Sequence, residues 1–137
     1  MKKHLLTLFA ILAFGSLQAQ DLQKGNILGI HTLTIALDPN ASLNEYTDYY
    51  SNKLLPALRK EFPDAGIYML KGKRGLAENQ FGFIWVFKSD ADRNKYFGSD
   101  GNLTDLGNKA MQNIQTQSDE LSRLGSWTST YTDWEVL

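Results

Sequence analysis

Residues 65–89, AGIYMLKGKRGLAENQFGFIWVFKS, decide the fold, because they predict two strands joined by one connection. The second strand is apolar on both faces. One face carries four aromatic residues: Phe81, Phe83, Trp85 and Phe87. The other carries smaller residues: Gly82, Ile84 and Val86. A strand without a polar face is typical of a position inside a sheet, so we expect burial on both sides.

The segment before this strand pair predicts a strand and then a helix. NILGIHTLTIAL, residues 26–37, has the alternation of a strand and is broken by Pro39. Ser42 and Glu45 have the spacing of a capping box, which starts a helix continuing to residue 62. Pro56 lacks a backbone N–H and should kink or restart that helix.

Two helices and a strand are expected after the pair. Ser89 and Asp92 indicate the start of a short helix that ends at Gly98. Apolar residues at helical spacing predict one longer helix over 103–124. SWTSTYTDWEVL, residues 126–137, closes the chain as a strand.

The resulting order, β-α-β-β-α-β, is the ferredoxin-like arrangement: a four-stranded antiparallel sheet with helices on one face. One apolar set of the 81–87 strand is then left on the bare face of the sheet. A patch of this kind indicates an interface. Two copies packed sheet against sheet would bury it, so we predict a homodimer that forms a dimeric α+β barrel.

The first residues, MKKHLLTLFAILAFGSLQAQ, have the layout of a secretory signal peptide, with cleavage after Ala19. The apolar run is too short to span a membrane. We therefore predict a signal peptide over 1–19 and one domain over 20–137, exported to the periplasm or secreted from a bacterium. No membrane contact is expected after cleavage.

Composition excludes several classes of function. Without Lys2 and Lys3, the 14 basic residues fall to 12 against 15 acidic ones, a balance that favours neither nucleic acid nor an anionic membrane. The chain has no cysteine, so disulfides, thiolate nucleophiles and thiolate metal sites are absent. With a single histidine after residue 19, no metal site is expected. The sequence also contains no G-x-S-x-G motif of serine hydrolases and no Gly-rich phosphate-binding loop.

Two stretches resemble the dimeric α+β barrel superfamily, which includes antibiotic-biosynthesis-monooxygenase-like proteins and stress-responsive Dabb domains. GIHTLTIAL, residues 29–37, is similar to the first strand of Dabb-type domains. FIWVFKSDADRNKYF, residues 83–97, is similar to the strand-then-helix passage of the superfamily, S-x-x-x-R-x-x-Y-F. The resemblance implies the same fold and a cofactor-independent oxygenase as one possible activity. Haem is not expected, because no matching ligand motif accompanies His31.

His31 shares a strand face with apolar residues and has two interpretations. In the first it lines a cleft and acts as a general base or hydrogen-bond partner, since an imidazole titrates near neutral pH. In the second it is structural, with its ring nitrogens satisfied by a backbone carbonyl or a tyrosine of the next helix. The resemblance supports the first, because some Dabb-like enzymes use a histidine and tyrosines in their pocket.

Four aromatic residues are expected to contact a ligand: Tyr46, Tyr50, Phe83 and Trp85. KGKRG, residues 71–75, either cradles an anion or is a solvated hairpin connection, and the second interpretation is favoured. The first functional hypothesis is an exported homodimer that binds a small apolar or aromatic molecule. The alternatives are a cofactor-independent monooxygenase or cyclase using His31, and an interaction module without a ligand.

Overall fold

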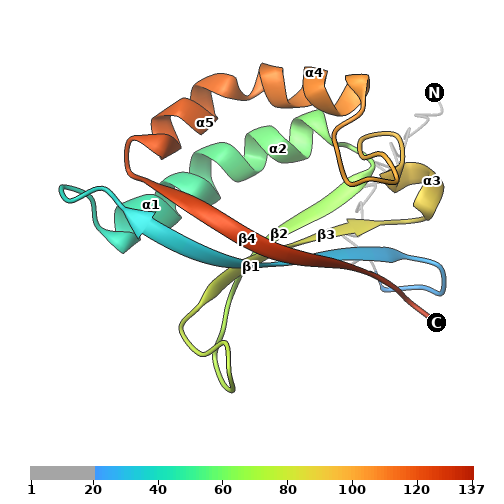
Figure 1. Ribbon diagram of the computed structural model, residues 1–137, viewed down its shortest axis with the longest axis horizontal. Helices are drawn as coiled ribbons and strands as arrows, with labels where there is room; N and C mark the ends of the chain where they lie inside the picture. The colour runs from blue at the N-terminus through green and yellow to red at the C-terminus, as the bar shows by residue number, and fades with distance from the viewer. Residues whose placement is uncertain (1–20) are drawn as a thin grey trace, which may run out of the picture.

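The computed structural model describes residues 21–137, which form one four-stranded antiparallel sheet with helices on one face (Figure 1). The strands lie in the order β2-β3-β1-β4. Their bounds are β1 Ile27–Leu37, β2 Ala65–Lys71, β3 Phe81–Phe87 and β4 Gly125–Glu135. The helical elements are α1 Leu43–Tyr49, η1 Tyr50–Leu54, α2 Leu55–Glu61, α3 Asp90–Arg93, α4 Asp105–Asn113 and α5 Gln115–Ser122. The order and topology are those of the ferredoxin-like fold, as predicted.

The two faces of the sheet differ in their side chains, and the register shows which set lies where. His31 pairs with Phe83 on one side and with Tyr131 on the other, so these three residues share a face. Phe83 and Phe87 are almost fully buried under the helices, so the aromatic set of β3 faces inward. Gly82, Ile84 and Val86 therefore lie on the bare face.

The long helix after β1 contains a wide turn, η1, which solves a problem of spacing. Five buried residues recur every fourth position: Tyr46, Tyr50, Leu54, Leu58 and Phe62. In a regular α-helix each step of four residues overshoots a turn by about 40°, so the set would drift through about 160°. In η1 the Leu55 N–H instead donates to the Tyr50 carbonyl, five residues back. The extra residue in this turn returns the set to one face.

Pro56 follows the wide turn directly, at the start of α2. The sequence predicts a kink or restart at this residue. In the structure the wide turn lies directly before Pro56, and the backbone stays helical at Leu54 and Leu55. A wide turn interrupts the regular hydrogen bonds between residues four apart, so the missing N–H of proline is accommodated there. The wide turn thus both holds the core residues in phase and accommodates Pro56.

The region after β3 departs from the sequence prediction at three points. The first short helix ends at Arg93 rather than Gly98, because Phe97 forms an isolated bridge with Leu103. The next helix begins at Asp105 rather than 103, where Thr104 Oγ1 accepts a hydrogen bond from the Gly107 N–H. That helix is also broken at Ile114, whose backbone (φ −105°, ψ 11°) leaves the helical region.

The predicted signal peptide lies outside the described residues. Within residues 21–137, no helix is long and apolar enough to cross a membrane.

Candidate functional site

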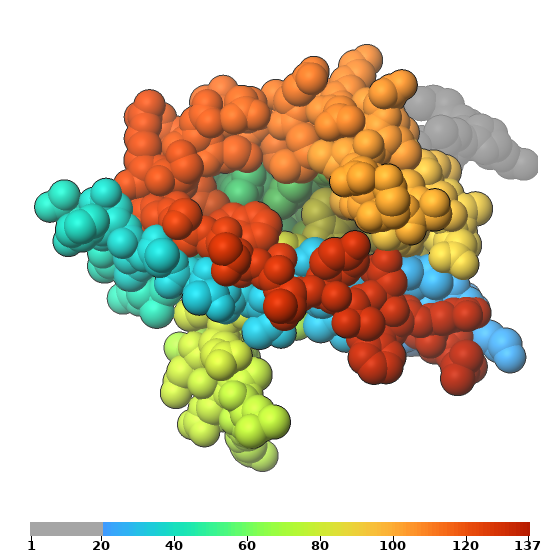
Figure 2. Space-filling model, in the orientation of Figure 1, coloured from blue at the N-terminus to red at the C-terminus, as the bar shows by residue number. Residues whose placement is uncertain are grey.

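A cavity of about 500 Å³ lies between the inward face of the sheet and the helices. Figure 2 shows the molecule hollowed between β4 and the α4–α5 pair, with parts of α2 and β3 visible inside. The cavity is therefore open to solvent along the edge of the sheet formed by β4. Its volume lies in the range of sites that bind small molecules, roughly 300–1,000 Å³.

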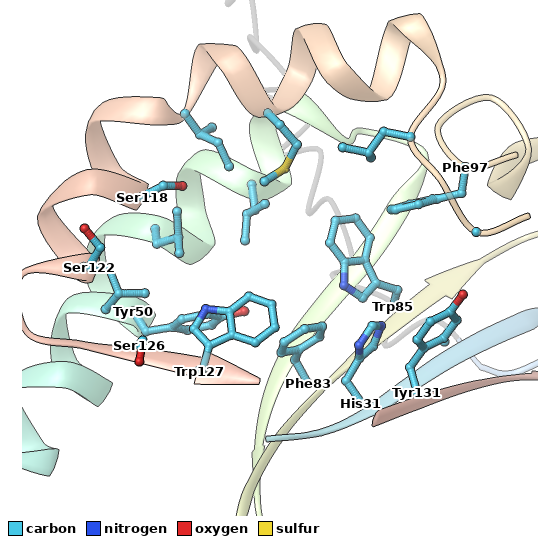
Figure 3. Close-up of a pocket in the computed structure, with 18 of the residues that line it drawn as sticks. His31, Tyr50, Phe83, Trp85, Phe97, Ser118, Ser122, Ser126, Trp127 and Tyr131 are labelled. Carbon is cyan, nitrogen blue, oxygen red and sulfur yellow. The ribbon is translucent and has the colours of Figure 1, made fainter. Parts of the chain in front are cut away.

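Aromatic and aliphatic side chains make most of the wall (Figure 3). The sheet and its adjoining loops contribute Phe83, Trp85, Phe87, Phe97, Trp127 and Tyr131. The helices and the segment before α4 contribute Leu54, Leu58, Leu103, Met111, Ile114 and Leu121. Such a wall favours a flat, apolar ligand, because rings stack on aromatic faces and exclude water from them.

His31 lies on the floor of this cavity, in the middle of β1. Its ring stacks on Phe83, with centroids 4.2 Å apart, and on Tyr131, with centroids 5.1 Å apart. Figure 3 shows the imidazole held between these two rings below Trp85. Nδ1 has a long 3.4 Å contact with the Ser129 hydroxyl oxygen. Among residues 21–137, Nε2 has no hydrogen-bond partner.

The surroundings of His31 favour a neutral imidazole. Partial burial lowers its pKa below the ordinary value, because desolvation penalises the charged form. The carboxylate of Asp133 opposes this effect and raises the pKa by a smaller amount. The lowered pKa makes the ring a hydrogen-bonding group, and a proton acceptor, rather than a fixed cation at neutral pH.

Asp133 is the acid of this cluster, and Arg93 binds one of its two oxygens. Arg93 Nε donates to Asp133 Oδ2 at 2.8 Å, and the arginine side chain is only 12% exposed. Arg93 also donates to the carbonyls of Phe97 and Gly98, each at 3.1 Å. The arginine therefore joins the end of α3, the following loop and β4 at one end of the cavity.

Gly29 separates the imidazole from the carboxylate and lines the cavity between them. A Cβ atom on this residue would lie 3.1 Å from Asp133 Oδ1 and 3.9 Å from His31 Nε2. Both polar atoms thus border one point above the Gly29 backbone. Within the described residues, Asp133 Oδ1 has no hydrogen-bond partner.

The loop after α3 closes the cavity near Tyr131. Gly101 adopts φ +79°, a conformation that favours glycine, and lines the cavity. A Cβ atom on Gly101 would overlap the Tyr131 hydroxyl. This close approach brings the loop against the stacked rings of Tyr131 and His31.

The tyrosines of the first helix occupy the other side of the site, away from the imidazole. Tyr50 lines the cavity, and burial raises the pKa of its phenol, with Tyr46 adding to the effect and Arg59 opposing it. Tyr46 is fully buried outside the lining, and burial raises its pKa to about 12. Its hydroxyl has no hydrogen-bond partner in the described part of the chain. Both phenols stay protonated at neutral pH.

The structure brings together four of the five residues expected in a site: His31, Tyr50, Phe83 and Trp85 line one cavity. Tyr46 lies behind the wall. In the structural interpretation a tyrosine or a backbone carbonyl was expected to satisfy the imidazole of His31. Within the described residues, its polar contact is instead with the hydroxyl of Ser129 on the adjacent strand. The functional role of these residues stays a prediction.

Sequence reasoning missed Asp133, Arg93 and Gly29, although two signals were present. Period-two alternation in β4 places Trp127, Ser129, Tyr131 and Asp133 on one face, so a carboxylate accompanies aromatic residues. Arg93 is the arginine of the S-x-x-x-R-x-x-Y-F stretch that resembles the superfamily.

The connection between β2 and β3, which includes KGKRG, projects away from the cavity (Figure 1). Gly75 there has φ +84°, as expected of a hairpin connection. Within residues 21–137, no group of three His, Cys, Asp or Glu side chains is placed to hold a metal ion.

No family model matches the sequence, and no curated protein is significantly similar to it. Two NIPSNAP family proteins from Agrobacterium tumefaciens are similar in structure. The first has a TM-score of 0.54 at 15% identity, over 80% of this chain and 90% of that protein. The second, of unknown function, has a TM-score of 0.52 at 13% identity, over 83% and 92%. This chain has a ferredoxin-like fold.

A third neighbour is SnoaB, a cofactor-independent oxygenase from Streptomyces nogalater. It gives a TM-score of 0.48 at 12% identity, over 82% of this chain and 94% of that protein. The two NIPSNAP family proteins support the fold of this chain. They show no specific function.

Proposed function

We propose that this protein binds a flat, mainly apolar small molecule in the cavity between the sheet and the helices. The observation that carries the proposal is an open cavity of about 500 Å³ with aromatic walls and a polar cluster at one end. Protein interiors are normally packed without voids of this size. Rings of Phe83, Trp127 and Trp85 offer faces on which a planar molecule stacks.

Equilibrium dialysis of naphthalene against the protein tests the proposal. We expect saturable binding at one site per chain. Met111→Trp, which fills the cavity from α4, should weaken binding at least tenfold. Leu106→Trp makes a comparable change on the same helix, at a residue that is 49% exposed and does not line the cavity, and should bind like the wild type. Absence of saturable binding, or equal binding by both variants, would overturn the proposal.

The second candidate is an enzyme of the cofactor-independent monooxygenase or cyclase type. The lowered pKa of His31 supports it, because an uncharged imidazole at the wall of the cavity is able to accept a proton from a bound substrate. The test is turnover of a flat hydroxylated substrate, followed by oxygen consumption and product mass. His31→Phe keeps a stacking ring and should abolish turnover if the imidazole moves the proton. The third hypothesis, an interaction module without a ligand, leaves the cavity unexplained.

We also propose that two copies associate through the bare face of the sheet. That face carries Ile30, Ile84 and Tyr68 side by side across three strands. Ile30 is 38% and Tyr68 is 45% exposed, although apolar side chains of this size are usually buried. Burial against a second copy would remove this surface from water, as for an isologous dimer. Export by the predicted signal peptide is part of the same proposal.

A further inference from the structure

Two polar atoms that have no hydrogen-bond partner among residues 21–137 border the same space above Gly29. One is Asp133 Oδ1, whose sister oxygen is bound to Arg93. The other is His31 Nε2, on a ring whose orientation is fixed by stacking on Phe83 and Tyr131. A Cβ atom on Gly29 would approach both. Polar atoms at the wall of an apolar cavity select the ligand group that binds there, because a ligand that displaces their water without replacing its hydrogen bonds leaves them unpaired at a cost in free energy.

The charges of this cluster nearly cancel. The Arg93 guanidinium neutralises the Asp133 carboxylate, and the His31 imidazole is held towards its neutral form by partial burial. A charged ligand group therefore gains little from Coulomb attraction and loses its hydration on entry. The point above Gly29 favours a neutral polar group.

We infer that the ligand carries a hydroxyl group, and that this hydroxyl binds between His31 Nε2 and Asp133 Oδ1 above Gly29. Asp133 and Gly29 are then specificity-determining residues. The inference rests on the proposed binding function and adds the chemical class of the ligand.

A hydroxyl satisfies both atoms when the imidazole proton is on Nε2: the ligand oxygen accepts from the imidazole, and the ligand hydrogen is donated to Asp133 Oδ1. With the proton on Nδ1, directed at Ser129, a hydroxyl donates to only one of the two acceptors, Nε2 or Oδ1. The proposed site therefore uses the form of His31 that is protonated on Nε2. An ether or a carbonyl accepts only, so it leaves Oδ1 unpaired and places two oxygen lone pairs opposite each other. A carboxylate adds a negative charge beside Asp133.

Binding of four matched probes tests the inference: 2-naphthol, 2-methoxynaphthalene, 2-naphthaldehyde and 2-naphthoate. By equilibrium dialysis, the wild type should bind 2-naphthol about tenfold more tightly than the methyl ether, the ratio expected for one hydrogen bond. The aldehyde should resemble the ether, and the carboxylate should bind most weakly.

Asp133→Asn provides the decisive variant, because its amide has the same shape and offers N–H donors in place of an acceptor. We expect the preference for 2-naphthol over 2-naphthaldehyde to fall to about one or to reverse. Glu135→Gln is the matched control, since Glu135 is the next residue on the same face of β4, carries the same charge and does not line the cavity. Glu135→Gln should keep the wild-type ratio of the affinities for 2-naphthol and 2-naphthaldehyde. Gly29→Ala places a methyl group against Oδ1 and should lower the ratio without abolishing naphthalene binding.

The outcomes separate the inference from the proposed function. If naphthalene and all four probes fail to bind, the binding function fails and the inference falls with it. If the probes bind equally well, or if Asp133→Asn keeps the wild-type preference, the hydroxyl site is wrong while the binding function stands. Tightest binding of 2-naphthoate would also overturn the hydroxyl site, since it would show an anion site dominated by Arg93.

Discussion

Arg93 and Asp133 form the ion pair that joins the end of α3 to the last strand, with Nε and Oδ2 2.8 Å apart. The same guanidinium donates to two backbone carbonyls of the following loop, at Phe97 and Gly98. The two residues are 40 positions apart in the sequence. Their contact therefore fixes the loop, the strand and one end of the cavity relative to one another.

We predict that Arg93→Met lowers the free energy of unfolding by about 1–3 kcal/mol, because it leaves a carboxylate and two carbonyls without their donor. Urea unfolding followed by circular dichroism measures the change. Arg123→Met is the control: its ion pair with Glu120 is exposed, and surface pairs of this kind contribute about 0–1 kcal/mol. Equal effects of the two substitutions would show that the Arg93 network adds nothing to stability.

His31 predicts a dependence of stability on pH. Its pKa in the folded state is lowered by desolvation, so below about pH 6.5 the unfolded chain binds a proton that the folded chain does not. Above about pH 6.5 protonation of His31 therefore takes nothing from the free energy of unfolding. As the pH falls from about 6.5 to the lowered pKa, the free energy of unfolding decreases.

His31 is the only histidine after residue 19, so His31→Phe should flatten the slope of unfolding free energy between pH 7 and 5. Histidine proton resonances of the wild type should titrate below the ordinary pKa in the same experiment. A pKa at or above 6.5 would contradict the buried, neutral imidazole.

The strands were predictable because β1 and β3 alternate with a period of two residues. Which set of β3 side chains faces the helices was not predictable, because both sets are apolar. The spacing of Tyr46 and Leu58 also predicted a helix up to residue 62. The wide turn η1 was not predicted, because the pattern was interpreted as ordinary helical spacing although an exact repeat of four drifts around an α-helix. Pro56 supplied part of the signal.

Individual site residues were predictable, but the contacts between elements that assemble the site were not. Tyr50 was expected from the helix and lines the cavity. His31 and Phe83 were identified since each is conspicuous within its own strand. Asp133 and Arg93 form a pair only when β4 lies beside β1 and the loop after α3 folds over the end of β4. No local sequence pattern specifies that these two side chains come into contact. Gly29 gives no chemical signal in the sequence; its role comes from the side chains that converge above it.

The bare face of the sheet leads to a prediction about assembly. Ile84→Lys places a charge between Ile30 and Tyr68 and should convert a dimer to a monomer in light scattering after gel filtration. Cavity binding of naphthalene should persist, because Ile84 points away from the helices. Leu76→Lys, at a fully exposed position in the β2–β3 connection, is the control and should stay dimeric. A wild-type protein that is already monomeric at high concentration would refute association through this face.

The wide turn and Pro56 should be energetically coupled. Removing Asn52, an exposed residue of η1, leaves the buried residues within one face of a regular α-helix, since their spacing then averages less than four. Pro56 would then lie inside a continuous helix, at a cost of about 3 kcal/mol. We therefore expect the deletion alone to be strongly destabilising, and the deletion combined with Pro56→Ala to recover most of that loss. Urea unfolding of the four proteins in this cycle gives the coupling free energy.

A deletion in a regular helix should behave differently. Lys109 is exposed in the middle of α4, and its removal rotates Ala110 relative to Gly107 by about 100°, which takes a buried residue off the core face. No proline substitution is available to restore that phase, so this deletion should stay destabilising. If the Asn52 deletion with Pro56→Ala is as unstable as the Lys109 deletion, the wide turn does more than correct the helical phase. In that event the core would require the widened backbone of η1 itself, and not only the placement of Tyr50 and Leu54 on one face of the helix.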